Sequence, residues 1–107
     1  MEDSALCQAA AEAERGLIDA DLGGGVIKQR IARKGRGKSG GFRVMILYRR
    51  GARAFFVHGF AKSERPNITR DELIALKELA RVMLAYGASE IARALKLGPL
   101  IEVKCYD

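Results

Sequence analysis

The chain has 107 residues, a formal net charge of +6 and 49% hydrophobic residues. This length provides one hydrophobic core, and we expect residues 1–107 to form a single domain. No apolar run approaches the roughly 20 residues of a membrane-spanning helix. The acidic start Met1-Glu2-Asp3 also lacks the layout of a secretory signal. These features argue against a membrane or secreted protein and predict a cytoplasmic one.

The first predicted element is a helix over residues 4 to about 19, because apolar residues from Leu6 to Leu17 recur at helical spacing. The run Gly23-Gly24-Gly25 then stops any helix, since three glycines lose too much conformational entropy to remain helical. A break is therefore expected between this helix and the next element of the chain.

Three consecutive strands are predicted next, at Val26–Ala32, Phe42–Tyr48 and Ala54–Phe60. Alternation in the first strand places Lys28 and Arg30 together on the face opposite its isoleucines. The second strand is apolar on both faces apart from Arg43, which predicts a central position in the sheet. The glycine-rich, basic segment Arg33–Gly41 is predicted to be a mobile loop, and Arg49–Ala52 a hairpin turn.

Two helices and a final strand are predicted in the last third of the chain. Thr69 and Glu72 have the spacing of a capping box, and Gly87 can end the helix that follows. A short helix over Ser89–Leu97 and a last strand over Leu100–Tyr106 complete the pattern. Consecutive strands with short turns predict an α+β domain, an antiparallel sheet with helices on one side.

Basic residues are concentrated in one segment of the chain. Eleven of the nineteen lie between Leu22 and Ser63, where the chain has no Asp or Glu. Both signs usually intersperse on a surface without a charged partner. The segment therefore favours binding to phosphate backbones, an anionic membrane or an acidic protein over a purely solubilising role.

Cysteine and histidine residues are few. Cys7 and Cys105 are too few for a disulfide scaffold, which favours free thiols in a reducing compartment. His58 is the single histidine, so no zinc-site spacing exists and no metal or other cofactor is expected. Because His58 alternates with Phe56 and Phe60, a packed or half-exposed structural role is favoured over catalysis.

Two further motifs are incomplete. Ala32–Ser39 approaches a phosphate-binding loop but starts with Ala and precedes a predicted strand instead of a helix. Ala88–Leu95 has the character of the first helix of a helix-turn-helix, yet Gly98-Pro99 and a predicted strand follow in place of a recognition helix. Nucleotide hydrolysis and sequence-specific DNA reading are therefore disfavoured.

Three sequence stretches together are distinctive: GGGVIKQR at Gly23–Arg30, GKSGGFR at Gly37–Arg43 and GFAKSER at Gly59–Arg65. With them the chain resembles the RelE/ParE superfamily of toxins, and within it a HigB-like branch of type II toxin–antitoxin systems. The resemblance implies a RelE-like fold, cleavage of messenger RNA on the ribosome without a metal, and a helix-turn-helix antitoxin encoded next door.

The resemblance also implies roles for the basic residues. Arg43 would stabilise the phosphate, while Lys28, Arg30 and Lys62 would hold RNA or move protons. Arg65 would orient phosphate, or pair with Glu64 as a structural residue. Further RNA or ribosome contacts are expected from the loop residues Arg33, Lys34, Arg36 and Lys38.

Two departures from the family pattern keep alternatives open. Some relatives have a catalytic tyrosine four residues after Arg65, where this chain has Thr69, so the proton-transfer partner is not identified. The first strand of the family is missing from the predicted pattern, which would leave a sheet edge for an antitoxin or a second copy to cover. The alternatives are a non-enzymatic ParE-like toxin that binds gyrase, and an inactive member that binds only nucleic acid or its antitoxin.

Overall fold

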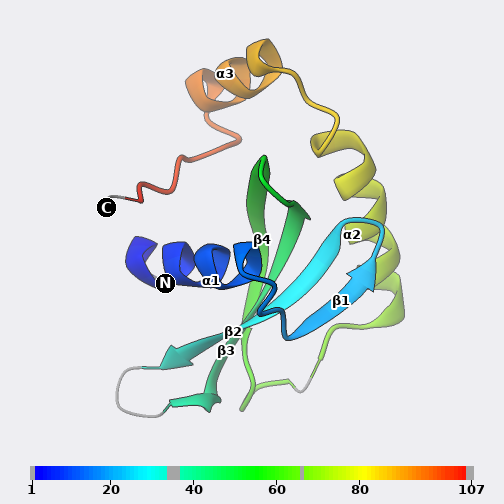
Figure 1. The fold of residues 1–107 in the computed structure, drawn as a ribbon. Helices are drawn as coiled ribbons and strands as arrows, with labels where there is room; N and C mark the ends of the chain where they lie inside the picture. The colour runs from blue at the N-terminus through cyan, green and yellow to red at the C-terminus, as the bar shows by residue number, and fades with distance from the viewer. Residues whose placement is uncertain (1, 34–36, 66, 106–107) are drawn as a thin grey trace.

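The computed structural model describes residues 2–33, 37–65 and 67–105, with side chains described outside 32–40. Within these residues, one antiparallel sheet has the strand order β1-β2-β3-β4, with bounds Ala20–Gly23, Val26–Arg33, Gly37–Arg49 and Arg53–Ala61. The helices are α1, α2 and α3, with bounds Asp3–Glu14, Arg70–Met83 and Ala88–Leu97 (Figure 1). The predicted α+β class is confirmed, as is the central position of β3.

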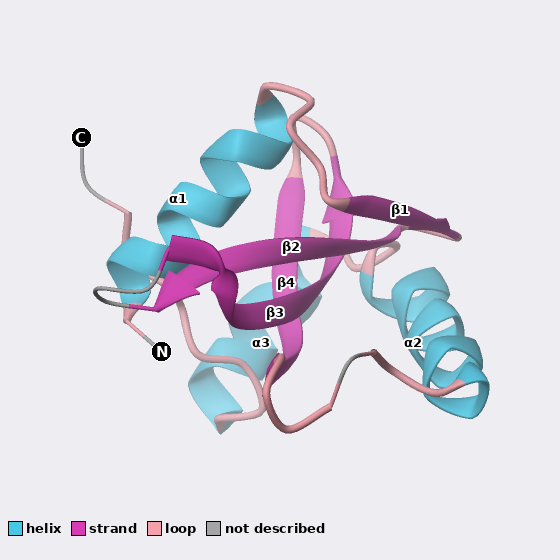
Figure 2. Cartoon of the chain, turned by 90° about the horizontal axis from the view of Figure 1, so that it is seen from below, coloured by secondary structure: helices cyan, strands magenta, loops and turns pink. Residues whose placement is uncertain are grey.

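The helices α1 and α2 pack on opposite faces of the sheet (Figure 2). On the α2 face, the buried side chains are those of Val26, Met45, Leu47, Phe60, Ala80, Met83 and Leu84. On the α1 face, they are those of Ala9, Ala13, Ile27, Ile31, Val44 and Ile46. The prediction of helices on one side was wrong, because β2 and β3 carry apolar residues on both faces and each face needs a cover.

The N-terminal region differs from its prediction. The helix α1 ends at Glu14, and Gly16 then adopts a left-handed conformation with φ of 80°. Residues predicted as the end of the helix lead instead into β1, in which Ala20 lies opposite Lys28 of β2. The glycine run forms the tight β1–β2 turn. Gly25 has a φ of 84°, which favours glycine, and a Cβ there would lie 2.7 Å from Leu84 Cδ1, so the Leu84 side chain would have to move.

The β2–β3 connection is shorter than predicted. Strand β2 continues to Arg33 and β3 begins at Gly37, with these two residues opposite each other. Residues 34–36 of the predicted loop Arg33–Gly41 lie outside the described residues. One further pair, Arg33 with Gly37, extends the ladder past a register shift that follows Ile31. The predicted turn at Arg49–Ala52 is confirmed, with Ala52 N–H donating to Arg49 O at 3.0 Å.

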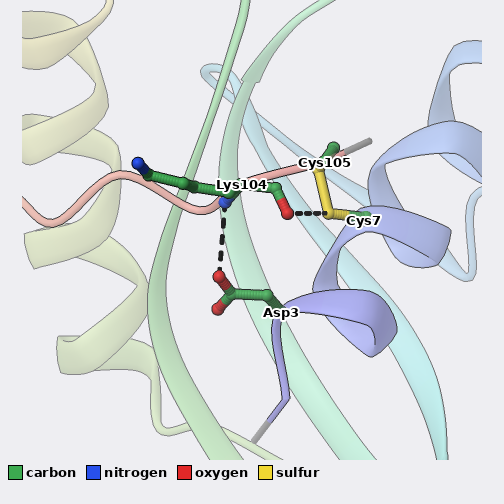
Figure 3. Close-up of a disulfide and its surroundings, with 4 residues drawn as sticks. All are labelled: Asp3, Cys7, Lys104 and Cys105. Carbon is green, nitrogen blue, oxygen red and sulfur yellow. Dashed lines mark hydrogen bonds between the residues drawn. A yellow bond between two sulfur atoms is a disulfide. The ribbon is translucent and has the colours of Figure 1, made fainter. Parts of the chain in front are cut away.

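The chain after α3 forms no strand, so the strand predicted over Leu100–Tyr106 was wrong for its described part. This tail returns from α3 to α1 and is bonded there, Cys105 to Cys7 (Figures 1 and 3). The prediction of free thiols was also wrong. The two cysteines are 98 positions apart in sequence, but their Cα atoms are 5.7 Å apart and their sulfur atoms are bonded. Lys104 N–H also donates to Asp3 Oδ2 at 3.3 Å.

The tail borders an apolar cavity of about 860 Å³ between α1, β4, α2 and α3. Its lining includes Leu6, Phe56, Met83, Leu95 and Ile101.

Every described helix is too short or too polar to span a bilayer.

Candidate active site

The sheet register brings basic residues from separate strands onto one face. Arg30 of β2 lies directly opposite Arg43 of β3, and Lys28 lies opposite Met45. Paired residues in an antiparallel sheet point to the same face, and alternate residues of a strand do too. Because Met45 packs in the core under α2, these three cations lie on the α2 side of the sheet.

Strand β4 extends this arrangement. Phe60 lies opposite Arg43, and His58 lies opposite Met45, so both side chains share the same face. Lys62 N–H donates to Gly41 O at 3.3 Å, which continues the ladder one residue past β4 and places Lys62 in phase with them. We call the set Lys28, Arg30, Arg43 and Lys62 the basic face.

Exposure differs among the four residues of the basic face. Lys62 is exposed and the Arg30 side chain is 49% exposed, whereas that of Lys28 is 17% exposed. Arg43 is buried, with 5% of its surface accessible, and its Nη1 donates to Phe42 O at 3.4 Å. Arg30 and Lys62 are therefore accessible to solvent, Lys28 is largely covered, and Arg43 lies beneath the surface of the sheet.

An acidic residue that sequence analysis assigned to the first helix contacts this face. Arg30 Nε donates to Asp19 Oδ1 at 2.7 Å, and Lys28 Nζ lies 4.0 Å from Asp19 Oδ2. Asp19 is in turn fixed by buried Gln29, whose Oε1 accepts from Asp19 N–H at 2.8 Å. The Gln29 amide also donates to the carbonyls of Ala9 and Leu17. The signal for Gln29 was present in sequence, as a polar side chain in the inward phase of a strand.

A second acidic residue lies at the start of α2. Both oxygens of Glu72 accept from the guanidinium of Arg65, and Glu72 Oε1 also accepts from Thr69 N–H at 2.7 Å. These donors, Arg65 first, lower the pKa of Glu72 to about 2. The capping box predicted for Thr69 and Glu72 is confirmed. The partner of Arg65 is Glu72, not the predicted Glu64, and the Arg65 guanidinium lies 5.4 Å from the centre of the Phe60 ring.

His58 lies near Phe60 and Glu72 and is half-exposed, as the sequence predicted. Its ring centre is 5.8 Å from that of Phe60, and its Nε2 is 3.9 Å from Glu72 Oε2. Within the described residues, Nε2 is buried and has no hydrogen-bond partner. A buried polar atom without a partner is rare, because its desolvation is uncompensated.

The family model described as the RelE toxin of the RelE/RelB toxin–antitoxin system matches residues 1–103. The chain belongs to the RelE toxin family. No curated protein and no solved structure matches it. The toxin is thus part of a toxin–antitoxin system, and an antitoxin is its partner.

The remaining basic residues between Leu22 and Ser63 belong to two stretches of the chain, 33–38 and 49–53. Arg33 and Lys38 have no described side chains, and Lys34 and Arg36 lie outside the described residues, so their roles remain predictions. Further basic residues, Arg49, Arg50 and Arg53, flank the β3–β4 turn at the far end of the sheet from Lys62. The single basic segment of the sequence therefore forms two separate groups. No described cluster of His, Cys, Asp and Glu is arranged to hold a metal ion.

Proposed function

We propose that this toxin is a ribosome-dependent endoribonuclease that cleaves messenger RNA at the basic face. The observation that carries the proposal is the cross-strand pair of Arg30 and Arg43, with Lys28 beside it. Like charges directly opposite each other destabilise a sheet. Asp19 offsets part of the charge on Arg30 and Lys28, and a phosphate bound at the basic face would offset more of it. The arrangement therefore favours an anionic ligand over an empty face.

The chemistry that this face supports is attack of a ribose 2′-hydroxyl on the neighbouring phosphate. RNA brings its own nucleophile, so the protein has to stabilise charge on the phosphorane and to move protons. We assign phosphate stabilisation to Arg43, RNA binding to Lys28 and Arg30, and proton donation to Lys62. Arg65 has all three guanidinium nitrogens engaged, and we assign it to positioning Glu72 and Phe60 instead of phosphate.

We also propose the partners of the toxin and its branch within the family. A helix-turn-helix antitoxin would mask the basic face with an acidic or amphipathic segment, and the ribosome would present the messenger RNA. We infer from both that the toxin acts in the cytoplasm, a reducing compartment in which the Cys7–Cys105 bond would be open. The step above requires no metal. The GKSGGFR and GFAKSER stretches support a HigB-like branch.

Expression in cells without the antitoxin tests the proposal. We expect growth arrest with transcripts cut inside coding regions, an effect that Lys62→Ala weakens at least tenfold. Lys96→Ala, which removes a lysine from exposed α3, should leave toxicity unchanged. Arrest with intact transcripts and a DNA-damage response would favour a gyrase-binding toxin instead. No arrest by a folded chain would favour an inactive member.

A further inference from the structure

We propose that His58 is the general base of the cleavage reaction and that Glu72 positions its imidazole. The inference rests on the proposed ribonuclease function and supplies the proton acceptor that the basic face lacks. Arg is protonated at all accessible pH values, and Lys is protonated near neutral pH unless strongly perturbed. Histidine is the side chain that ordinarily exchanges a proton near neutral pH.

The order of residues along β4 carries the first part of the argument. His58, Phe60 and Lys62 follow one another on the same face, with Arg43 directly opposite Phe60. Alternate residues of a strand are about 7 Å apart. Arg43 and Phe60 are 5% and 6% exposed, so a phosphate between His58 and Lys62 would lie above them and meet Arg43 only at its accessible edge. It would have the imidazole on one side and the ammonium on the other. In-line displacement needs this placement, with the base beside the attacking oxygen and the acid beside the departing one.

The surroundings of the imidazole carry the second part. Glu72 Oε2 lies 3.9 Å from His58 Nε2, so a small side-chain rotation closes a hydrogen bond that satisfies this buried atom. Glu72 itself is held in place by the guanidinium of Arg65 and the backbone of Thr69. A carboxylate on Nε2–H fixes the tautomer whose free lone pair is on Nδ1. The side chain is 37% exposed although Nε2 is buried, so the accessible surface belongs to the rest of the residue.

The proton balance of the step is complete. His58 Nδ1 takes the proton of the 2′-hydroxyl as the 2′-oxygen forms its bond to phosphorus. The bond between phosphorus and the 5′-oxygen breaks, and the 5′-oxygen takes a proton from the Lys62 ammonium. The products are a 2′,3′-cyclic phosphate and a 5′-hydroxyl, and solvent then returns the imidazolium proton to Lys62. Among the described residues, Glu72 lies 3.9 Å from the imidazole, Arg65 pairs with Glu72, and Arg43 lies opposite Phe60, two residues further along β4.

Cleavage of ribosome-bound messenger RNA by purified His58→Ala toxin tests the inference. We expect a loss of at least about 100-fold, the usual share of a general base. Added imidazole should restore cleavage in proportion to its concentration, while pyrazole, a ring of equal size and far weaker basicity, should not. His58→Gln, which keeps much of the volume but cannot exchange a proton, should change the dependence of the cleavage rate on pH.

The outcomes separate the inference from the proposed function. If the parent toxin and the His58→Ala variant cut at the same rate, His58 is not the general base, and the ribonuclease function stands. If His58→Ala cuts more slowly, added imidazole does not restore the rate, and the pH profile of His58→Gln matches that of the parent, His58 has a structural role and the inference is overturned as well. A folded parent toxin that cuts nothing overturns the proposed function, and the role of His58 with it.

Discussion

Arg30 Nε donates to Asp19 Oδ1 at 2.7 Å, so an exposed cation of the basic face is held by an acidic residue just ahead of β1. This ion pair turns Arg30 toward the β1 edge and reduces the charge that the face presents. An RNA phosphate that binds Arg30 has to compete with Asp19. Asp19 thus acts as an internal competitor for the ligand that we propose.

Replacing Asp19 with Asn removes this competition while keeping the side-chain size. We expect tighter binding of a short single-stranded RNA at low salt, because Arg30, the closer of the two cations that contact Asp19, becomes available to phosphate. The slope of log affinity against log salt should steepen by about 0.7, the value for one further phosphate contact on a single strand. Fluorescence anisotropy at several salt concentrations measures this, with Asp21→Asn on β1 as the matched control. An unchanged slope would show that Asp19 does not compete with RNA.

Gln29 should be a major source of stability. Gln29→Leu keeps the volume but leaves Asp19 N–H and the carbonyls of Ala9 and Leu17 without their partner. We expect the free energy of unfolding to fall by about 1 to 3 kcal/mol, the cost of leaving buried polar groups unsatisfied. Urea denaturation measures the loss, and Gln8→Leu on the exposed side of α1 serves as the control. Equal midpoints for the two variants would contradict the assigned network.

The ion pair of Arg65 and Glu72 predicts a dependence of stability on acid. The pKa of Glu72 is lowered to about 2, chiefly by Arg65, from an ordinary value of 4.5. A carboxyl with a lowered folded-state pKa adds stability above its unfolded-state pKa and loses it as the pH falls toward the folded-state value. We therefore expect the melting temperature to fall between pH 4.5 and 2.

The variant Glu72→Gln should be less stable at neutral pH and show a flatter fall in melting temperature across that acid range. Glu64→Gln, an exposed neighbour outside the ion pair, is the matched control. If Glu72→Gln melts with the same pH dependence as the parent chain, Glu72 does not contribute to acid sensitivity.

The Cys7–Cys105 disulfide should stabilise the chain and hold its tail. Cys7→Ser with Cys105→Ser removes a bond between residues 98 positions apart. We expect a loss of about 2 to 5 kcal/mol in the free energy of unfolding, mostly from a less constrained unfolded state. Amide exchange over residues 100–105 should also become faster. Reductant should affect the parent chain alone, and equal stability with and without reductant would show that the bond contributes nothing.

Much of the fold follows from local pattern. Alternation predicted β2, runs of apolar and aromatic residues predicted β3 and β4, and the capping box at Thr69 predicted the start of α2. Elements that depend on long-range pairing were not predictable in the same way. Strand β1 is four residues long and pairs with β2, and the irregular tail ends at the disulfide to α1. Neither partner is visible from the residues around it.

The candidate site, like the fold, was predictable from local pattern only in part. Alternation alone placed Lys28 and Arg30 on one face, but bringing Arg43 opposite Arg30 required the β2–β3 register. Asp19 and Glu72 were not predicted as neighbours of the site, since one was assigned to a helix and the other to a cap. His58 was assigned a structural role because sequence shows its apolar neighbours and not the carboxylate near its Nε2.

Cleavage of a defined messenger RNA by the purified toxin, with and without ribosomes, tests the central claim most directly. The account predicts cuts inside the reading frame only when ribosomes are present, with 5′-hydroxyl and 2′,3′-cyclic phosphate ends. Arg30→Ala and Lys62→Ala should each slow the cuts at least tenfold, and Lys96→Ala should not. Intact messenger RNA after incubation of ribosomes with folded toxin would contradict the account.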